Sequence, residues 1–76
     1  MRVLVADDHD LVRETIAAFL ASEGDIEVSM AGSLAEAMVL TAKEGSFDLV
    51  LLDYNMPGMD GLDGLRKMIA ANENRP

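Results

Sequence analysis

Apolar and polar residues along the chain form two kinds of short pattern that predict strands. Val3 to Ala6 and Leu49 to Leu52 are unbroken apolar runs, typical of strands buried on both faces of a parallel sheet. Ile26 to Met30 alternates apolar with polar residues, which indicates a half-exposed strand at a sheet edge. We therefore expect the two unbroken strands to be central neighbours and the alternating one to lie outside them.

The segment between the first two predicted strands has apolar residues at helical spacing. From Leu11 to Ser22 the apolar residues recur on one face of a helix, with Asp10 as the expected N-cap and Gly24 after its end. The residues of this stripe are Val12, Ile16, Phe19 and Leu20.

Two further helices follow. Ser33 and Glu36 have the spacing of a capping box, so a helix should run from there to about Lys43 and end at Gly45. We expect it to pack through Leu34, Ala37, Met38 and Ala42. The last helix follows Asp60-Gly61 and carries the apolar stripe Leu62, Leu65, Met68 and Ile69. The order β-α-β-α-β-α predicts one α/β unit with a parallel sheet and right-handed crossovers.

Composition narrows the function classes. Half of the 76 residues are apolar, which excludes a disordered tail, and no apolar run approaches the roughly 20 residues of a membrane span. Fourteen acidic against six basic residues give a net charge of −8, which opposes direct contact with nucleic acid and favours cations or basic partners. With no cysteine and no signal peptide, we expect a cytoplasmic protein without membrane contact.

Acidic residues follow both unbroken strands. If these strands are parallel neighbours, Asp7, Asp8 and Asp53 gather at one edge of the sheet, where open α/β sheets bind ligands. Oxygen ligands favour a hard ion such as Mg²⁺, beside which an aspartate can attack phosphorus. An aspartate after a strand can also be a turn former or a helix cap. The pattern alone leaves both interpretations open.

Two separated segments resemble the receiver domain of two-component response regulators. The run from Arg2 to His9 is similar to the first strand and acidic pair of that family, and Asp53 to Gly61 is similar to its phosphoacceptor loop. The Asp-Asp-His run followed by Leu11-Val12-Arg13 is most similar to receivers that precede a helix-turn-helix effector, which implies transcription regulation by a full-length protein.

The resemblance implies a role for each acidic residue. Asp53 would accept the phosphoryl group, Asp8 would bind Mg²⁺ directly and Asp7 would bind it through water. Asn55 would offer its backbone carbonyl to the metal. The donor would be a phosphohistidine on a sensor histidine kinase, and the receiver itself would catalyse the transfer and the later hydrolysis. His9 is expected to be a structural neighbour of the acidic pair.

The loop after the acceptor is similar to the family pattern as well. Pro57 and Gly58 would shape it, and Gly61 would allow the turn into the last helix. The resemblance implies a flavodoxin-like fold with strand order 2-1-3-4-5, of which residues 1–76 would supply the N-terminal part in the order 2-1-3. The Ser or Thr and the Lys that contact the phosphoryl group would belong to the fourth and fifth strands.

The third strand of such a truncated receiver would have an unpaired apolar edge, so we expect self-association instead of a stable monomer. Two alternatives stay open. The chain could be an interaction and oligomerisation module that is not phosphorylated. It could also be a phosphatase of the haloacid dehalogenase type, although that family has a second acid two residues after its nucleophile, where this chain has Asn55.

Overall fold

The computed structural model describes residues 1–73 and 75, and strands alternate with helices along them. The elements are β1 (Arg2–Ala6), α1 (Asp10–Ala21), β2 (Glu27–Ala31), α2 (Leu34–Glu44), β3 (Leu49–Leu52) and α3 (Leu62–Ala71). The expected order of elements is confirmed, and no bound differs from the expected one by more than one residue.

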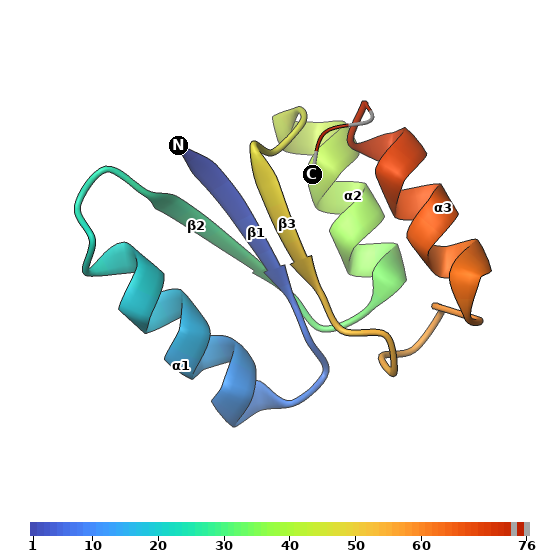
Figure 1. The fold of residues 1–76 in the computed structure, drawn as a ribbon, viewed down its shortest axis with the longest axis horizontal. Coiled ribbons are helices and arrows are strands. Elements are labelled where there is room, and N and C mark those ends of the chain that lie inside the picture. Colours follow the sequence, from blue (N-terminus) through green and yellow to red (C-terminus); the bar gives the residue numbers. More distant parts are fainter. Residues whose placement is uncertain (74, 76) are drawn as a thin grey trace.

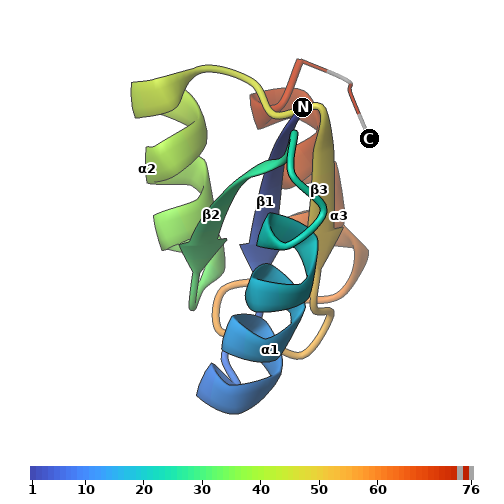
Figure 2. The ribbon, with the colours of Figure 1, turned by 90° about the vertical axis from the view of Figure 1, so that its left-hand side faces the viewer.

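The three strands form one parallel sheet in the order β2-β1-β3, with β1 in the centre. Helix α1 covers one face, and α2 and α3 lie together on the other, which gives three layers (Figures 1 and 2). This is the flavodoxin-like arrangement that the sequence predicts. β2 is an edge strand, as its alternating pattern indicates, and β3 is the other edge among the described residues.

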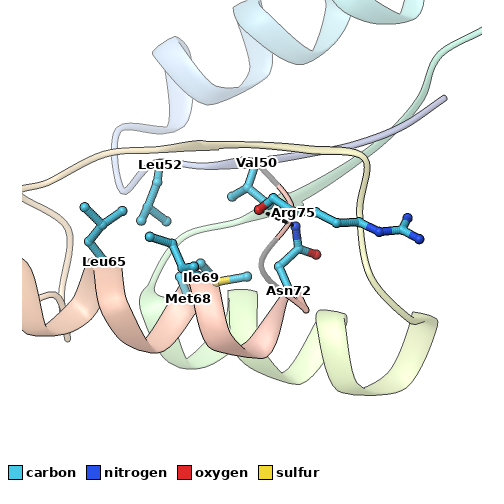
Figure 3. A pocket seen from close by; sticks show the side chains of 7 residues that line it. All are labelled: Val50, Leu52, Leu65, Met68, Ile69, Asn72 and Arg75. Atoms are coloured by element: carbon cyan, nitrogen blue, oxygen red, sulfur yellow. Dashed lines mark hydrogen bonds between the residues drawn. The ribbon is translucent and has the colours of Figure 1, made fainter.

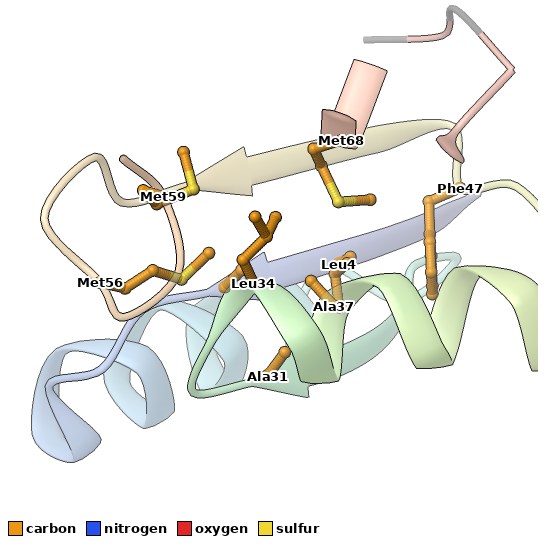
Figure 4. Packing of buried hydrophobic residues seen from close by; sticks show 9 residues of the cluster. Leu4, Ala31, Leu34, Ala37, Phe47, Met56, Met59 and Met68 are labelled. Atoms are coloured by element: carbon orange, nitrogen blue, oxygen red, sulfur yellow. The ribbon is translucent and has the colours of Figure 1, made fainter. Parts of the chain in front are cut away.

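The main core lies between the sheet and the α2–α3 layer (Figure 4). Alternate residues of a strand point to opposite faces, so Leu4 and Ala6 of β1 enter this core while Val3 and Val5 face α1. Side chains from the other elements complete the cluster: Ala31, Leu34, Ala37, Phe47, Met56, Met59 and Met68. Met56 and Met59 belong to the loop after β3, so this loop is anchored by its own buried side chains.

The N-cap expected from the sequence is found in α2 but not in α1. Ser33 is the N-cap of α2, and its hydroxyl accepts the Glu36 N–H at 3.2 Å, as expected. The Glu36 carboxylate, however, accepts the N–H of Gly32 and not that of Ser33. In α1 the expected cap is wrong: Asp10 is the first helical residue, and its carboxylate accepts a bond from Arg13 instead.

The helices are covered less than their stripes predict. Helix α1 packs against β1 and β2 and buries only Ala17, which leaves Phe19 65% exposed. In α2 the buried residue of the last turns is Thr41, whose hydroxyl donates to the Ala37 carbonyl, while Ala42 is exposed. A hydroxyl that bonds within its own helix can be buried without leaving an unsatisfied polar group. Thr41 can therefore be buried in place of the expected Ala42.

Polar contacts fix the amino end of β3. The buried Asn72 carboxamide accepts the Phe47 N–H at 2.6 Å and donates to the Phe47 carbonyl at 3.0 Å. Next to it, the Asp48 carboxylate accepts the Arg2 N–H at 2.7 Å, and this bond holds the pKa of Asp48 below its usual range. These contacts tie the end of α3 and the start of β1 to the segment that enters β3.

Gly64 has a packing role that helix propensity does not reveal. A Cβ at this position would overlap with the Met59 carbonyl oxygen. Glycine therefore allows the loop after β3 to cross directly over the first turn of α3. The close approach compensates for the low helix propensity of this residue.

Candidate functional site

The register of the sheet brings the acidic residues of two loops together. Ala6 of β1 is opposite Leu52 of β3, and the ladder continues with a bond from the Asp53 N–H to the Ala6 carbonyl at 2.9 Å. On the other side of β1, the Asp7 N–H donates to the Ala31 carbonyl at 3.0 Å. Asp7 and Asp53 thus lie beside each other at the carboxyl edge of the sheet, as the sequence predicts.

Four side chains converge there: Asp7, Asp8, His9 and Asp53. Each offers one ligand atom, and these atoms lie within 4.8 Å of one another. Three of the four groups are carboxylates, the ligand type that Mg²⁺ prefers. The residues present therefore fit a hard divalent cation.

His9 belongs to this cluster, which goes beyond the structural role that the sequence suggests. Its Nδ1 lies 2.8 Å from Asp7 Oδ1, 3.1 Å from Asp8 Oδ1 and 3.6 Å from Asp53 Oδ2. The bond to Asp7 and the charges of Asp8 and Asp7 raise the pKa of His9. The His9 backbone N–H, followed by its ring, lowers the pKa of Asp7. When protonated, the His9 imidazole offsets part of the repulsion between the carboxylates.

Asp53 is accessible from one side of the site. Its side chain is 19% exposed and lines a groove of about 400 Å³ between β3 and α1. One carboxylate oxygen accepts the Asn55 N–H at 3.0 Å, which fixes the side-chain orientation at the start of the loop. The exposed Asn55 therefore bears on the site through its backbone.

The loop that follows is held against α2. The Pro57 carbonyl accepts the N–H of Leu34 at 3.0 Å and so satisfies a free donor of the α2 amino terminus. Gly58 has φ +93°, and a Cβ there would lie 3.1 Å from the Leu34 Cβ, so both its conformation and its surroundings require glycine. Gly61, at φ +63°, occupies the N-cap of α3, the place expected for it.

Comparison with known proteins agrees with this geometry. The family model described as the response regulator receiver domain matches residues 3–76, and the chain belongs to this family. The receiver domain of the hybrid histidine kinase CckA superposes with a TM-score of 0.86 at 34% identity, over all of this chain and 70% of that domain. The non-phosphorylated HemR receiver domain from Leptospira biflexa gives 0.81 at 28% identity, over 99% and 59% of the two chains.

The curated relatives have more than one kind of output. A protein-glutamate methylesterase/protein-glutamine glutaminase of Anaeromyxobacter dehalogenans is 50% identical over 92% of this chain. The transcriptional regulatory protein LiaR of Bacillus subtilis is 43% identical over 90% of it. The chain spans only 19% and 32% of the length of these two proteins.

Receiver domains generally bind Mg²⁺ at acidic residues and interact with sensor histidine kinases, and this chain has a cluster of acidic residues at the carboxyl edge of its sheet. Membership of the family also decides against the dehalogenase-type phosphatase. Among the described residues, no helix is both long and apolar enough to cross a membrane.

Proposed function

We propose that this chain is the phosphoacceptor module of a two-component response regulator. Asp53 would take a phosphoryl group from a phosphohistidine of a sensor histidine kinase. The proposal rests on the convergence of Asp7, Asp8 and Asp53 at the carboxyl ends of β1 and β3. One carboxylate oxygen of each residue lies within 4.8 Å of the others. Two loops distant in sequence meet there because of the parallel register.

Asp53 would be the acceptor and also one of the metal ligands. Asp8, the Asp53 carboxylate and the Asn55 backbone carbonyl would hold Mg²⁺, and Asp7 would bind it through a water molecule. When bound, the ion would neutralise negative charge on the transferred phosphoryl group. A carboxylate oxygen of Asp53 attacks phosphorus, the phosphorus–nitrogen bond of the donor breaks, and the imidazole nitrogen leaves with the electron pair.

The surrounding loop keeps Asp53 in place during this step. The Asn55 N–H orients the carboxylate, and Pro57 and Gly58 fix the loop on the amino end of α2. Gly61 allows the chain to turn into α3. An acceptor on a rigid strand end has little orientational freedom to lose when the donor arrives.

Intact-mass spectrometry after incubation with acetyl phosphate and Mg²⁺ tests the proposal. We expect one phosphoryl adduct in the parent and none in Asp53→Asn or in the presence of a chelator. A chain that circular dichroism shows to be folded, but that gains no adduct at any Mg²⁺ concentration, contradicts it.

The output of phosphorylation would reside in a longer protein. LiaR is named as a transcriptional regulator, so control of transcription is the output we propose for the full-length form. The net charge of −8 argues that the described segment does not itself contact DNA. We also propose that the module is cytoplasmic, where it would meet the phosphohistidine of the sensor kinase.

A second candidate function is self-association through β3. No other described segment pairs with the outer edge of this strand. Val50 and Leu52 face Leu65, Met68 and Ile69 of α3 across an apolar groove (Figure 3), and Leu51 lines the groove on the opposite face. An edge with apolar surface on both sides favours pairing with a strand of another copy. Sedimentation at micromolar concentration should show dimers or larger species, and a compact monomer would count against this function.

A further inference from the structure

Arg13 of α1 reaches back to the acidic loop and is only 18% exposed despite its charge. Its Nη1 donates to the Asp7 carbonyl at 2.9 Å, and its Nη2 donates to Asp10 Oδ1 at 2.7 Å. A planar guanidinium makes two such bonds in a fixed relative direction. Arg13 thus joins the loop after β1 to the first turn of α1.

The surroundings of Arg13 leave room for this geometry. The guanidinium lies in a polar groove of about 340 Å³ between the loop after β1 and the loop after β2, which Asp8 and Glu36 also line. A Cβ at Gly32 would lie 3.3 Å from Arg13 Nη1, so glycine keeps this wall of the groove open. The Gly32 N–H in turn donates to the Glu36 carboxylate at 3.1 Å, which fixes the wall from the α2 side.

The bond to the Asp7 carbonyl has a direct consequence for the metal ligands. This carbonyl belongs to the planar peptide that joins Asp7 to Asp8, so fixing it fixes the plane from which both carboxylates leave the backbone. We propose that Arg13 is a positioning residue, which holds Asp7 and Asp8 in the orientation that binds Mg²⁺. The inference rests on the proposed function of the acidic cluster.

Positioning and simple electrostatics predict opposite effects. A guanidinium next to the acidic pair repels a divalent cation, so removal of its charge alone would tighten Mg²⁺ binding. Loss of the positioning bonds would weaken it, because partners that orient metal ligands typically contribute 10–100-fold to affinity. The direction of the change in Arg13 variants therefore identifies the role.

The test is isothermal titration of the folded chain with Mg²⁺. We expect Arg13→Gln to weaken binding by about tenfold. Arg13→Lys keeps the charge but cannot make both bonds, so it should weaken binding as well. Gly32→Ala, which changes no charge and only crowds Nη1, should give a smaller loss in the same direction. Arg66→Gln, at an exposed position on α3, is the control and should bind like the parent.

Mg²⁺ affinity in Arg13→Gln that equals or exceeds the parent value overturns the positioning role. If the parent itself binds no Mg²⁺, the proposed function fails and hydrogen exchange in metal-free protein decides on Arg13. The His9 N–H, which donates to the Asp7 carboxylate, should then exchange faster in Arg13→Gln than in the parent. An unchanged rate in a folded variant also overturns the inference.

Discussion

β1 and β3 are adjacent strands with the same kind of sequence, an apolar run that ends in aspartate, yet they are buried to different degrees. Val3, Leu4 and Val5 are at most 1% exposed, whereas Leu51 is 37% exposed. The cause is the position of α1: Leu51 is opposite Val5 on the face that α1 covers, but among the described residues α1 packs against β1 and β2 and not against the edge strand β3. The apolar run of β3 therefore predicts more burial than the described residues give this strand.

The two ends of β3 differ in a related way. At its carboxyl end, the loop after β1 brings Asp7 and Asp8 next to Asp53, the proposed acceptor. Along its outer edge, no described segment supplies a partner. The acidic site depends only on two adjacent strands and the loops after them, all of which belong to the described residues. Four substitutions test these differences.

The largest effect is expected at the amino end of β3. Asn72→Ala would leave the buried N–H and carbonyl of Phe47 without partners and should lower the free energy of unfolding by about 2–4 kcal/mol. Urea denaturation at fixed protein concentration measures this. The control is Arg66→Ala at an exposed position of α3, and equal losses in the two variants would contradict the role of Asn72.

The next effect concerns the acidic cluster. Asp8→Asn should weaken Mg²⁺ binding by at least about tenfold, because a direct ligand contributes no less than the partners that orient it. Calorimetric titration measures the affinity. Asp63→Asn on α3 removes the same charge from an exposed ion pair with Lys67. If the two variants lose affinity equally, the overall charge of −8 attracts the ion and the site does not.

A smaller effect is expected at the open side of β3. Leu51→Lys should weaken self-association by about tenfold, since it places a charge on an apolar surface whose burial would drive pairing. Val39→Lys changes an exposed apolar residue of α2 and should leave the association unchanged. Analytical ultracentrifugation over a concentration series compares the two, and identical dissociation constants would exclude β3 as the interface.

The smallest effect is a pH dependence at Asp48. Its pKa in the folded chain lies below the ordinary value of 3.8, chiefly because its carboxylate accepts the Arg2 N–H. Its contribution is therefore fully present above the unfolded pKa and is lost as the pH falls through the folded pKa. Between about pH 5 and pH 2, Asp48→Asn should lose less stability than the parent. Parallel acid-unfolding curves would show that the bond contributes nothing.

The strand order and the acidic edge could be predicted because each depends on a local pattern and on parallel pairing. The alternating run from Ile26 to Met30 indicates an edge, and aspartates after both unbroken runs must meet if those strands are adjacent. The capping residue Ser33 was equally predictable, since its bond spans only three residues. These features need no knowledge of distant contacts.

Other features depend on contacts that no local pattern records. Asn72 lies in a polar segment and yet is buried, because Phe47 is brought to it from 25 residues away. Asp10 has a side chain that is common at N-caps, but its carboxylate accepts a bond from Arg13. At position 64 only glycine fits, because a Cβ would collide with the Met59 backbone. His9 reaches the site because its backbone N–H and its ring both contact the Asp7 carboxylate. Of these four residues only Asn72 has a partner distant in sequence, whereas Asp10, His9 and Gly64 contact residues two to five positions away and the path of their loops selects the partner.

The most direct test of the central claim is a Mg²⁺ titration followed by the backbone amide signals of the chain in two-dimensional NMR. We expect saturable shifts at Asp7, Asp8, Asp53 and Asn55, with the signals along β2 and the exposed face of α3 unchanged. Absence of any saturable shift, or equal shifts at acidic residues throughout the chain, would contradict a metal-dependent phosphoacceptor site at the ends of β1 and β3.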